Sequence, residues 1–310
     1  MILMPRSCFA LGRLLAVALL AASVLSHSGC GSSSVSPPPP GALSGNWQFN
    51  LIKNNPFQQE QLFASGFLQQ SNGDLTGSVQ GPTTTAVSGT VTCGGIGPLA
   101  GSISGQNINF TLDPGGTTIN FTGTVSTDQK LMSGSYAALG GACYDYPTSG
   151  TWTASLVPAL NGSFKGTLNS NYMAALTGSA NPVPVSVSGS FTQTPNAGGS
   201  TASLTGTISA VGYPCFTTAS LTGTISGQNI YLSVYGYNGL QIGSIGQAQL
   251  PGGALTPAIL TVTSTGLVVT GPNSTSGFNL NLGNPCPAVI NPNNGKTQTT
   301  DFGGFTLNLE

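Results

Sequence analysis

Residues 99–112 read LAGSISGQNINFTL, and residues 221–234 read LTGTISGQNIYLSV. Both stretches contain the pentapeptide SGQNI, and Cys215 follows Cys93 at the spacing that separates the two copies. A peptide and a cysteine that recur at one spacing indicate a duplicated unit. The chain has 310 residues, which is enough for two domains of ordinary size. The sequence therefore predicts two related lobes in tandem.

A five-residue unit, written apolar–polar–Gly–Ser/Thr–apolar, recurs through both halves of the chain. Alternate side chains of a strand share a face, so the two apolar residues and the glycine of each unit lie on one side. Glycine at such a position permits the close backbone approach and sharp coiling that a small barrel needs. The copies begin at Leu75, Val87, Leu99, Phe121, Met132, Val187, Leu204 and Leu221.

Strongly alternating segments open and close each predicted lobe. Residues 43–51 open the first lobe and residues 150–156 close it, while residues 160–168 and 305–309 do the same in the second. First and last strands with such strict alternation are typical of an up-and-down barrel, in which these two strands pair and leave no exposed edge. The predicted fold is all-β, with two tandem antiparallel meander barrels. Two β-sandwiches are the alternative, because a period of two is common to both folds.

The predicted lobes span residues 42–157 and 159–310. The second copy is longer between Ile230 and Cys286 than the first copy is over its equivalent stretch. We expect the extra residues to form added β structure or a long loop around positions 239–257. Beyond the N-terminal segment the pattern predicts little helix, with room for one turn near Tyr172.

The N-terminus has the layout of an export signal. Basic residues precede an apolar run at positions 14–25, which is shorter than the roughly 20 residues of a spanning helix. The sequence Ser28-Gly29-Cys30-Gly31 follows, and it resembles the processing site of bacterial lipoproteins. That resemblance implies a signal peptide over residues 1–29, a palmitate-bearing Cys30 and a membrane anchor in the cell envelope. Gly31 after the cysteine implies sorting to the outer membrane.

The alternative is cleavage near Ala21-Ala22, which would leave Cys30 as a free thiol. The cysteine count favours acylation, because removal of Cys8 with the signal leaves an odd number in an exported chain. Residues 30–41 are rich in Ser and Pro and are predicted to be an extended tether between the anchor and the lobes.

Four cysteines remain once Cys30 carries lipid, and they allow three pairings. Export favours disulfides, and the absence of a Cys-x-x-Cys motif argues against a metal site. Duplication favours one bridge in each lobe, so that every cysteine has an equivalent in the other copy. The predicted disulfides are Cys93–Cys143 and Cys215–Cys286.

The charge pattern excludes several functions. Charged residues make up 4% of the chain, and the few lysines are scattered, which excludes a nucleic-acid surface. His27 is the only histidine and Arg13 the last arginine, so both are lost with the signal. Catalysis by a Ser-His-Asp or Cys-His set and a histidine-based zinc site are therefore excluded. We predict no enzyme activity, no catalytic residues, no cofactor and no metal.

Two sets of aromatic residues are candidate ligand contacts. Gly45-Asn46-Trp47 resembles the Gly-x-Trp opening of lipocalin and avidin-type barrels, which implies an antiparallel barrel. Trp47 and Trp152 are either ligand contacts or core residues. Tyr231, Tyr235 and Tyr237 lie on one alternating face, where they contact a ligand or pack across strands.

We expect a lipid-anchored, non-catalytic envelope protein whose lobes bind a small ligand or an envelope protein. A structural or adhesive surface module is the first alternative. A glycoside hydrolase that uses carboxylates alone is the second, because paired carboxylates suffice for that reaction.

Overall fold

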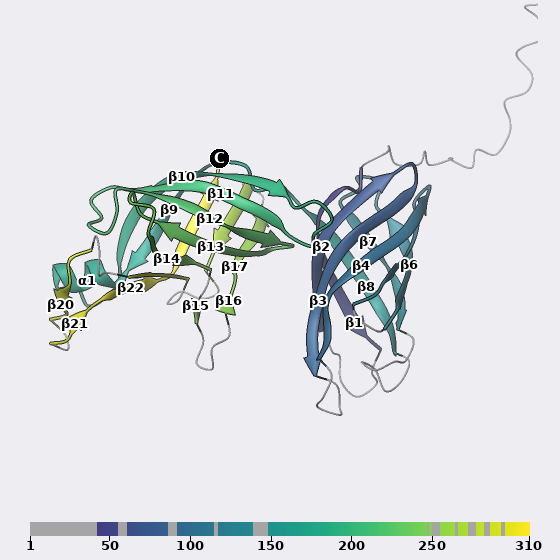
Figure 1. Ribbon diagram of the computed structural model, residues 1–310, viewed down its shortest axis with the longest axis horizontal. Coiled ribbons are helices and arrows are strands. Elements are labelled where there is room, and N and C mark those ends of the chain that lie inside the picture. The colour runs from purple at the N-terminus through teal and green to yellow at the C-terminus, as the bar shows by residue number, and fades with distance from the viewer. Residues whose placement is uncertain are drawn as a thin grey trace, which may run out of the picture. The chain divides into compact units, whose positions relative to one another are not determined.

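The structure is a computed structural model. It describes residues 42–54, 61–85, 92–114, 117–138, 148–246, 248–249, 255–263, 266–271, 277–281, 286–292 and 295–310. The predicted signal peptide, Cys30, the tether and the Cys93–Cys143 bridge lie outside the described residues. The part that is described consists almost entirely of antiparallel strands (Figure 1).

The first lobe is a closed eight-stranded barrel. Each strand pairs with its neighbour in sequence, and β1 pairs with β8 to close the ring, with Trp47 opposite Leu156 and Phe49 opposite Ala154. The strands are β1 (Gly45–Lys53), β2 (Gln61–Ser71), β3 (Asp74–Thr85), β4 (Thr92–Ser104), β5 (Asn107–Leu112), β6 (Ile119–Val125), β7 (Leu131–Ala138) and β8 (Thr148–Val157).

Apolar side chains fill the interior of the first barrel. The rings of Phe110 and Phe121 stack with centroids 4.6 Å apart, and the Trp152 ring meets both edge-on at 5.2 and 5.5 Å. Phe49 joins this cluster from β1. Each of these four side chains is at most 3% exposed. Offset and edge-to-face contacts of this kind add to the stability that burial provides.

The second lobe also closes into an eight-stranded ring, so the barrel prediction is confirmed and the sandwich alternative is not. The ring runs through β13 to β17, and its last strand pairs with its first. Its strands are β9 (Gly162–Ser170), β10 (Val183–Pro195), β11 (Ala202–Ala210), β12 (Thr218–Ser226), β13 (Asn229–Tyr235), β17 (Ala258–Thr263), β18 (Gly266–Thr270) and β23 (Phe305–Leu309).

The second barrel forks at β13. The first residues of β13 pair with β17 and the later ones pair with β14, which starts a branch through β19 to β22. The branch strands are β14 (Gln241–Ile245), β19 (Phe278–Asn281) and β22 (Thr300–Gly303). The remaining strands form two hairpins, β15 (Ala248–Gln249) with β16 (Leu255–Thr256) and β20 (Val289–Ile290) with β21 (Thr297–Gln298). β14, β15 and β16 fall within positions 239–257, where the sequence predicted added β structure.

The glycines of the repeated unit lie where another strand passes closely. A Cβ atom added to Gly101 would lie 2.2 Å from the carbonyl oxygen of Asn109 on the neighbouring strand. At Gly223 the distance to the carbonyl oxygen of Tyr231 would be 1.9 Å. Both separations are too short for a side chain, so the repeated glycine allows the tight coiling of each barrel, as the sequence predicted.

One predicted disulfide lies among the described residues. Cys215, in the loop between β11 and β12, is bonded to Cys286, and both are buried. The prediction of this pair is confirmed. The single helix among the described residues, α1 (Asn171–Thr177), follows β9 at the position where the sequence allowed one turn.

Candidate functional site

Part of the outer face of β1 and β2 is buried, although the barrel core lies on the other face. Alternation places Asn46 and Gln48 of β1, and Ser65 and Phe67 of β2, on the outside. Yet Asn46, Ser65 and Phe67 are only 2%, 6% and 7% exposed. The register sets Asn46 opposite Phe67 and Gln48 opposite Ser65, so these four residues form one surface. We call it the docking patch.

The turn between β12 and β13 covers the docking patch. The Asn46 amide group donates to the carbonyl oxygen of Gly227 at 2.8 Å, and the Gly227 N–H donates back to Asn46 Oδ1 at 2.7 Å. One side-chain amide thus satisfies both backbone groups of one residue. Paired bonds of this kind fix orientation as well as position, and they give the buried Asn46 amide both a donor and an acceptor partner.

Two further bonds extend the contact along β1 and β2. The Gln228 N–H donates to Gln48 Oε1 at 3.1 Å, and the hydroxyls of Ser65 and Ser226 are 2.8 Å apart. Phe67 packs into the apolar cluster of the second barrel. The contact between the barrels therefore consists of neutral hydrogen bonds around one buried aromatic ring.

Gly227 is the residue that lets this turn approach. Its φ of +55° favours glycine, and a Cβ atom there would lie 2.2 Å from Gln48 Oε1 and 2.6 Å from Ser65 Cβ. A side chain at this position would push the two barrels apart.

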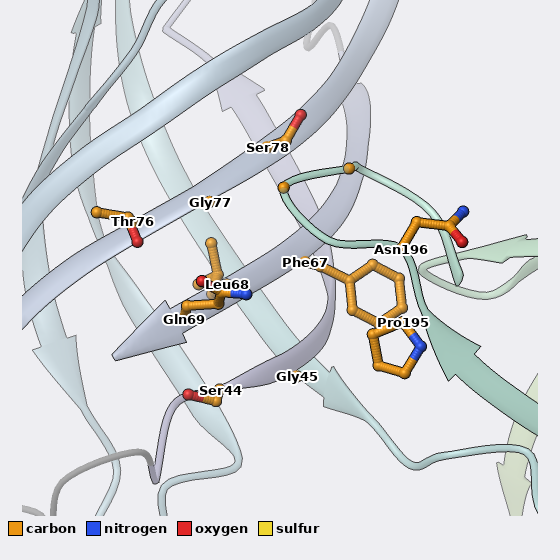
Figure 2. Close-up of a pocket in the computed structure, with 12 residues that line it drawn as sticks. Ser44, Gly45, Phe67, Leu68, Gln69, Thr76, Gly77, Ser78, Pro195 and Asn196 are labelled. Carbon is orange, nitrogen blue, oxygen red and sulfur yellow. The ribbon is translucent and has the colours of Figure 1, made fainter. Parts of the chain in front are cut away.

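A groove of about 400 Å³ lies beside the docking patch and shares Phe67 with it (Figure 2). Both barrels line the groove, the first through β1, β2 and β3 and the second through the turn between β10 and β11. The lining residues are Ser44, Gly45, Phe67, Leu68, Gln69, Thr76, Gly77, Ser78, Pro195, Asn196, Gly198 and Gly199.

The groove offers hydroxyl and amide groups beside an aromatic ring, and its lining has no charged side chain. Ser44 Oγ accepts from the Gln70 N–H at 3.0 Å, and the Asn196 amide is held by Thr201 and Ser203. These polar groups are therefore fixed in place before any ligand binds. Small, pre-positioned polar groups against an apolar wall are typical of a small-molecule site.

The aromatic residues singled out from the sequence lie away from this groove. Trp47 and Trp152 are 0% and 1% exposed and fill the interior of the first barrel. Tyr231 and Tyr235 lie on the outer face of β13, because their neighbours in the strand are the buried ones. Tyr237 is 91% exposed and lines a separate surface hollow of about 380 Å³ with Pro214 and Phe216, among others.

Sequence reasoning missed the docking patch. The signal that could have found it is the second copy of SGQNI, because a conformationally demanding turn repeated letter for letter suggests a contact that both copies could make. The partner residues Asn46 and Gln48 carry no such signal, since polar residues are expected on the outer face of any barrel strand.

A buried carboxylate lies at the other end of the second barrel. Asp301 of β22 is 0% exposed and accepts hydrogen bonds from Ser170 Oγ at 2.7 Å, from the Tyr172 N–H at 2.9 Å and from the Tyr213 hydroxyl. Burial raises the pKa of the Asp301 carboxyl, although hydrogen bonds from Ser170 and Tyr213 act in the opposite direction. Burial and the nearby Asp301 charge raise the pKa of Tyr213.

This cluster holds α1 in place. Ser170 is the N-cap and accepts from the Met173 N–H at 2.9 Å, while Asp301 takes up the Tyr172 N–H of the first turn. The Tyr172 hydroxyl donates to the carbonyl oxygen of Pro287, next to the disulfide, at 3.0 Å. Because Asp301 is enclosed, its role is to cap the helix rather than to meet a substrate.

Among the residues that the structure describes, no group of three or more His, Cys, Asp or Glu side chains is placed to hold a metal ion. Within the same residues, no helix has the length and apolar character needed to cross a membrane. Comparisons with protein-family models, curated proteins and solved structures gave no match. The function of the groove is therefore inferred from its chemistry.

Proposed function

We propose that this chain is a non-catalytic, lipid-anchored protein of the cell envelope that binds a neutral, hydroxyl-rich ligand, such as a carbohydrate, in the groove between its barrels. The observation that carries the proposal is the uncharged lining of that groove, with hydroxyl and amide groups around Phe67 and Pro195. Neutral sugars present hydroxyl groups at their rims and apolar C–H faces, which match this lining. Because apolar side chains fill the interior of the first barrel, we place the ligand site on its outer surface.

Titration of the purified protein with neutral oligosaccharides, followed by calorimetry, tests the ligand class. Gln69 and Thr76 are exposed residues of the groove, so Gln69→Ala or Thr76→Ala should weaken binding roughly tenfold without affecting folding. Gln80→Ala is the matched control, because Gln80 is exposed on the same strand as Thr76 but outside the groove. Equal effects of all three substitutions would refute the site.

Native mass spectrometry of the protein purified from its own host supplies an independent measurement. We expect a co-purifying neutral ligand whose occupancy falls in the Gln69→Ala chain. A charged co-purifying ligand would contradict the proposal.

The alternative of a structural or adhesive module is favoured by the filled interior of the first barrel and by the hydrogen-bonded contact between the barrels. It predicts no saturable binding of any small sugar. The alternative of a glycoside hydrolase predicts release of reducing ends from a neutral polysaccharide, which a reducing-sugar assay detects.

A further inference from the structure

The turn that covers the docking patch has an identical copy that covers none of the described residues. Ser104–Asn107 joins β4 to β5 just as Ser226–Asn229 joins β12 to β13, and Gly105 has a φ of +62° against +55° at Gly227. Apart from Gly105 and its two chain neighbours, no described residue has an atom within 4 Å of the position that a Cβ atom would take at Gly105. The first barrel therefore presents to solvent the element that the second barrel uses for docking.

The two turns are also held alike by their own barrels. The carbonyl oxygen of Gln106 accepts from the Val125 N–H at 2.8 Å, and that of Gln228 accepts from the Leu260 N–H at 2.8 Å. This bond fixes the turn in both barrels. It leaves the glycine peptide groups at the tip, where those of Gly227 meet the docking patch.

A second surface with the chemistry of the docking patch lies on the second barrel. In the docking patch, Asn46 pairs with Phe67, and two residues further along Gln48 pairs with Ser65. On the branch, β19 and β22 pair antiparallel in the same order, with an asparagine opposite a phenylalanine and then an amide opposite a hydroxyl. The residues of this branch patch are Asn279, Phe302, Asn281 and Thr300.

The branch patch is open to solvent. Asn279 and Asn281 are exposed and alternate with buried residues of β19, so both point outward. Phe302 is 45% exposed, although a large apolar side chain gains stability when it is covered. The corresponding Phe67 of the docking patch is 7% exposed because the second barrel packs on it.

We infer that the Ser104–Asn107 turn of one chain docks on the branch patch of a second copy of this chain. Asn279 would pair with the peptide groups of Gly105 as Asn46 pairs with those of Gly227, and Phe302 would be covered as Phe67 is. Each chain then has one unused turn on its first barrel and one unused patch on its second. An interface between unlike surfaces continues from copy to copy unless the rotation closes a ring, so the chains assemble head to tail.

The position of the branch patch leaves room for such an assembly. β22 lies beside α1 in the second barrel (Figure 1), and α1 follows Ser170, which pairs with Val183 at the start of β10. The turn that covers the docking patch lies instead beside the end of β10. The two contacts of the second barrel are therefore at opposite ends, and one does not block the other.

Two variants are designed so that each one blocks a different surface of the proposed contact. Gly105→Asn blocks the turn, because a side chain there would meet the patch as a Cβ atom at Gly227 meets Gln48, while asparagine tolerates a positive φ. Asn279→Lys blocks the branch patch from an exposed position. Asn308→Lys, at an exposed position on β23, is the matched control.

The measurement is the mass distribution of the full chain by sedimentation velocity and native mass spectrometry. All chains carry Cys30→Ser, so that acylation adds no mass. We expect the parent and the Asn308→Lys control to form a series of oligomers that lengthens with concentration. Gly105→Asn alone and Asn279→Lys alone should be monomers, and an equimolar mixture of the two should form dimers and nothing larger.

The inference fails if the parent chain remains monomeric at all concentrations. It also fails if either variant assembles like the parent, or if the mixture of the two stays monomeric. Circular dichroism and thermal melting identify any variant that has lost its fold, and Asn279→Ala then replaces Asn279→Lys. The inference does not depend on the lipid anchor or on the groove ligand.

Discussion

Gly105 and Gly227 show how one residue type in one turn takes two roles. Both have a positive φ, so both are required by the backbone, but within a single chain only Gly227 is also required by a contact. The same substitution at both glycines causes the same backbone strain. The difference between the two losses of unfolding free energy therefore measures the contribution of the contact between the barrels.

Gly227→Asn is expected to lower the free energy of unfolding by about 1–3 kcal/mol, the usual cost of forcing extra atoms into a packed contact. At concentrations at which the parent chain is monomeric, Gly105→Asn should change it by less than about 0.5 kcal/mol, as is usual for an exposed site. Urea unfolding followed by tryptophan fluorescence and circular dichroism measures both. Equal losses in the two variants would show that the barrels do not depend on this turn.

Asp301 gives the stability of the chain a pH dependence. Its folded-state pKa lies above the ordinary value of 3.8 because it is buried. A raised pKa means that the folded chain holds the proton more tightly, so this contribution to stability is complete below pH 3.8 and is lost as the pH rises through the folded value. The asparagine of Asp301→Asn cannot ionise, so the variant should lose less stability than the parent as the pH rises.

Unfolding of the parent and of Asp301→Asn between pH 3 and pH 8 measures the difference. Asp128→Asn is the control of opposite sign, because hydrogen bonds from Ser126 and the Lys130 N–H lower the pKa of exposed Asp128. Asp128→Asn should instead remove a contribution to stability that is present above about pH 3.8 and is lost as the pH falls further. A parent and an Asp301→Asn chain with parallel pH profiles would contradict the role of burial.

At the scale of the element, the sequence predicted the strands, but it did not predict which other elements contact their outer faces. Alternation and the repeated glycine predicted barrel strands and their inner faces, because both depend on local spacing. The repeated SGQNI turn could have indicated a contact, but its partner on the outer face of β2 could not be predicted, since that face carries no local signal of its own. The hydrogen bond from the Tyr172 N–H of α1 to Asp301 could not be predicted either, because the two residues lie far apart in the sequence.

The fork at β13 has the same origin. The length difference between the copies predicted added β structure, but not that one strand would pair with β14 at one end and with β17 at the other. Pairing partners of this kind are chosen by packing across the whole barrel rather than by the strand itself.

The disulfide supports the α1 end of the second barrel. Cys215→Ala with Cys286→Ala should lower the free energy of unfolding by roughly 2–5 kcal/mol. It should also speed amide exchange in α1, because the Tyr172 hydroxyl is bonded to Pro287 beside the bridge. Hydrogen exchange with mass spectrometry measures both effects, and β1–β8 serve as an internal control. Faster exchange throughout the first barrel would contradict a local role.

At the scale of the whole molecule, the proposed anchor leads to a direct test. Cells grown with radioactive palmitate should label the parent chain, and Cys30→Ser should abolish the label and release the protein from the membrane fraction. Cys8→Ser is the matched control, because Cys8 lies within the predicted signal peptide and should have no effect on either readout. Label that persists in the Cys30→Ser chain would refute the anchor.

Among the described residues, the hydrogen bonds that link the docking patch to the turn of the second barrel join uncharged groups. Asn46, Gln48 and Ser65 meet peptide groups and a hydroxyl, and the ring of Phe67 packs among them. Dissolved salt screens the attraction between exposed charges that lie more than about 10 Å apart at 0.1 M, whereas neutral amides carry no net charge to be screened. The association of the two barrels should therefore change little with ionic strength.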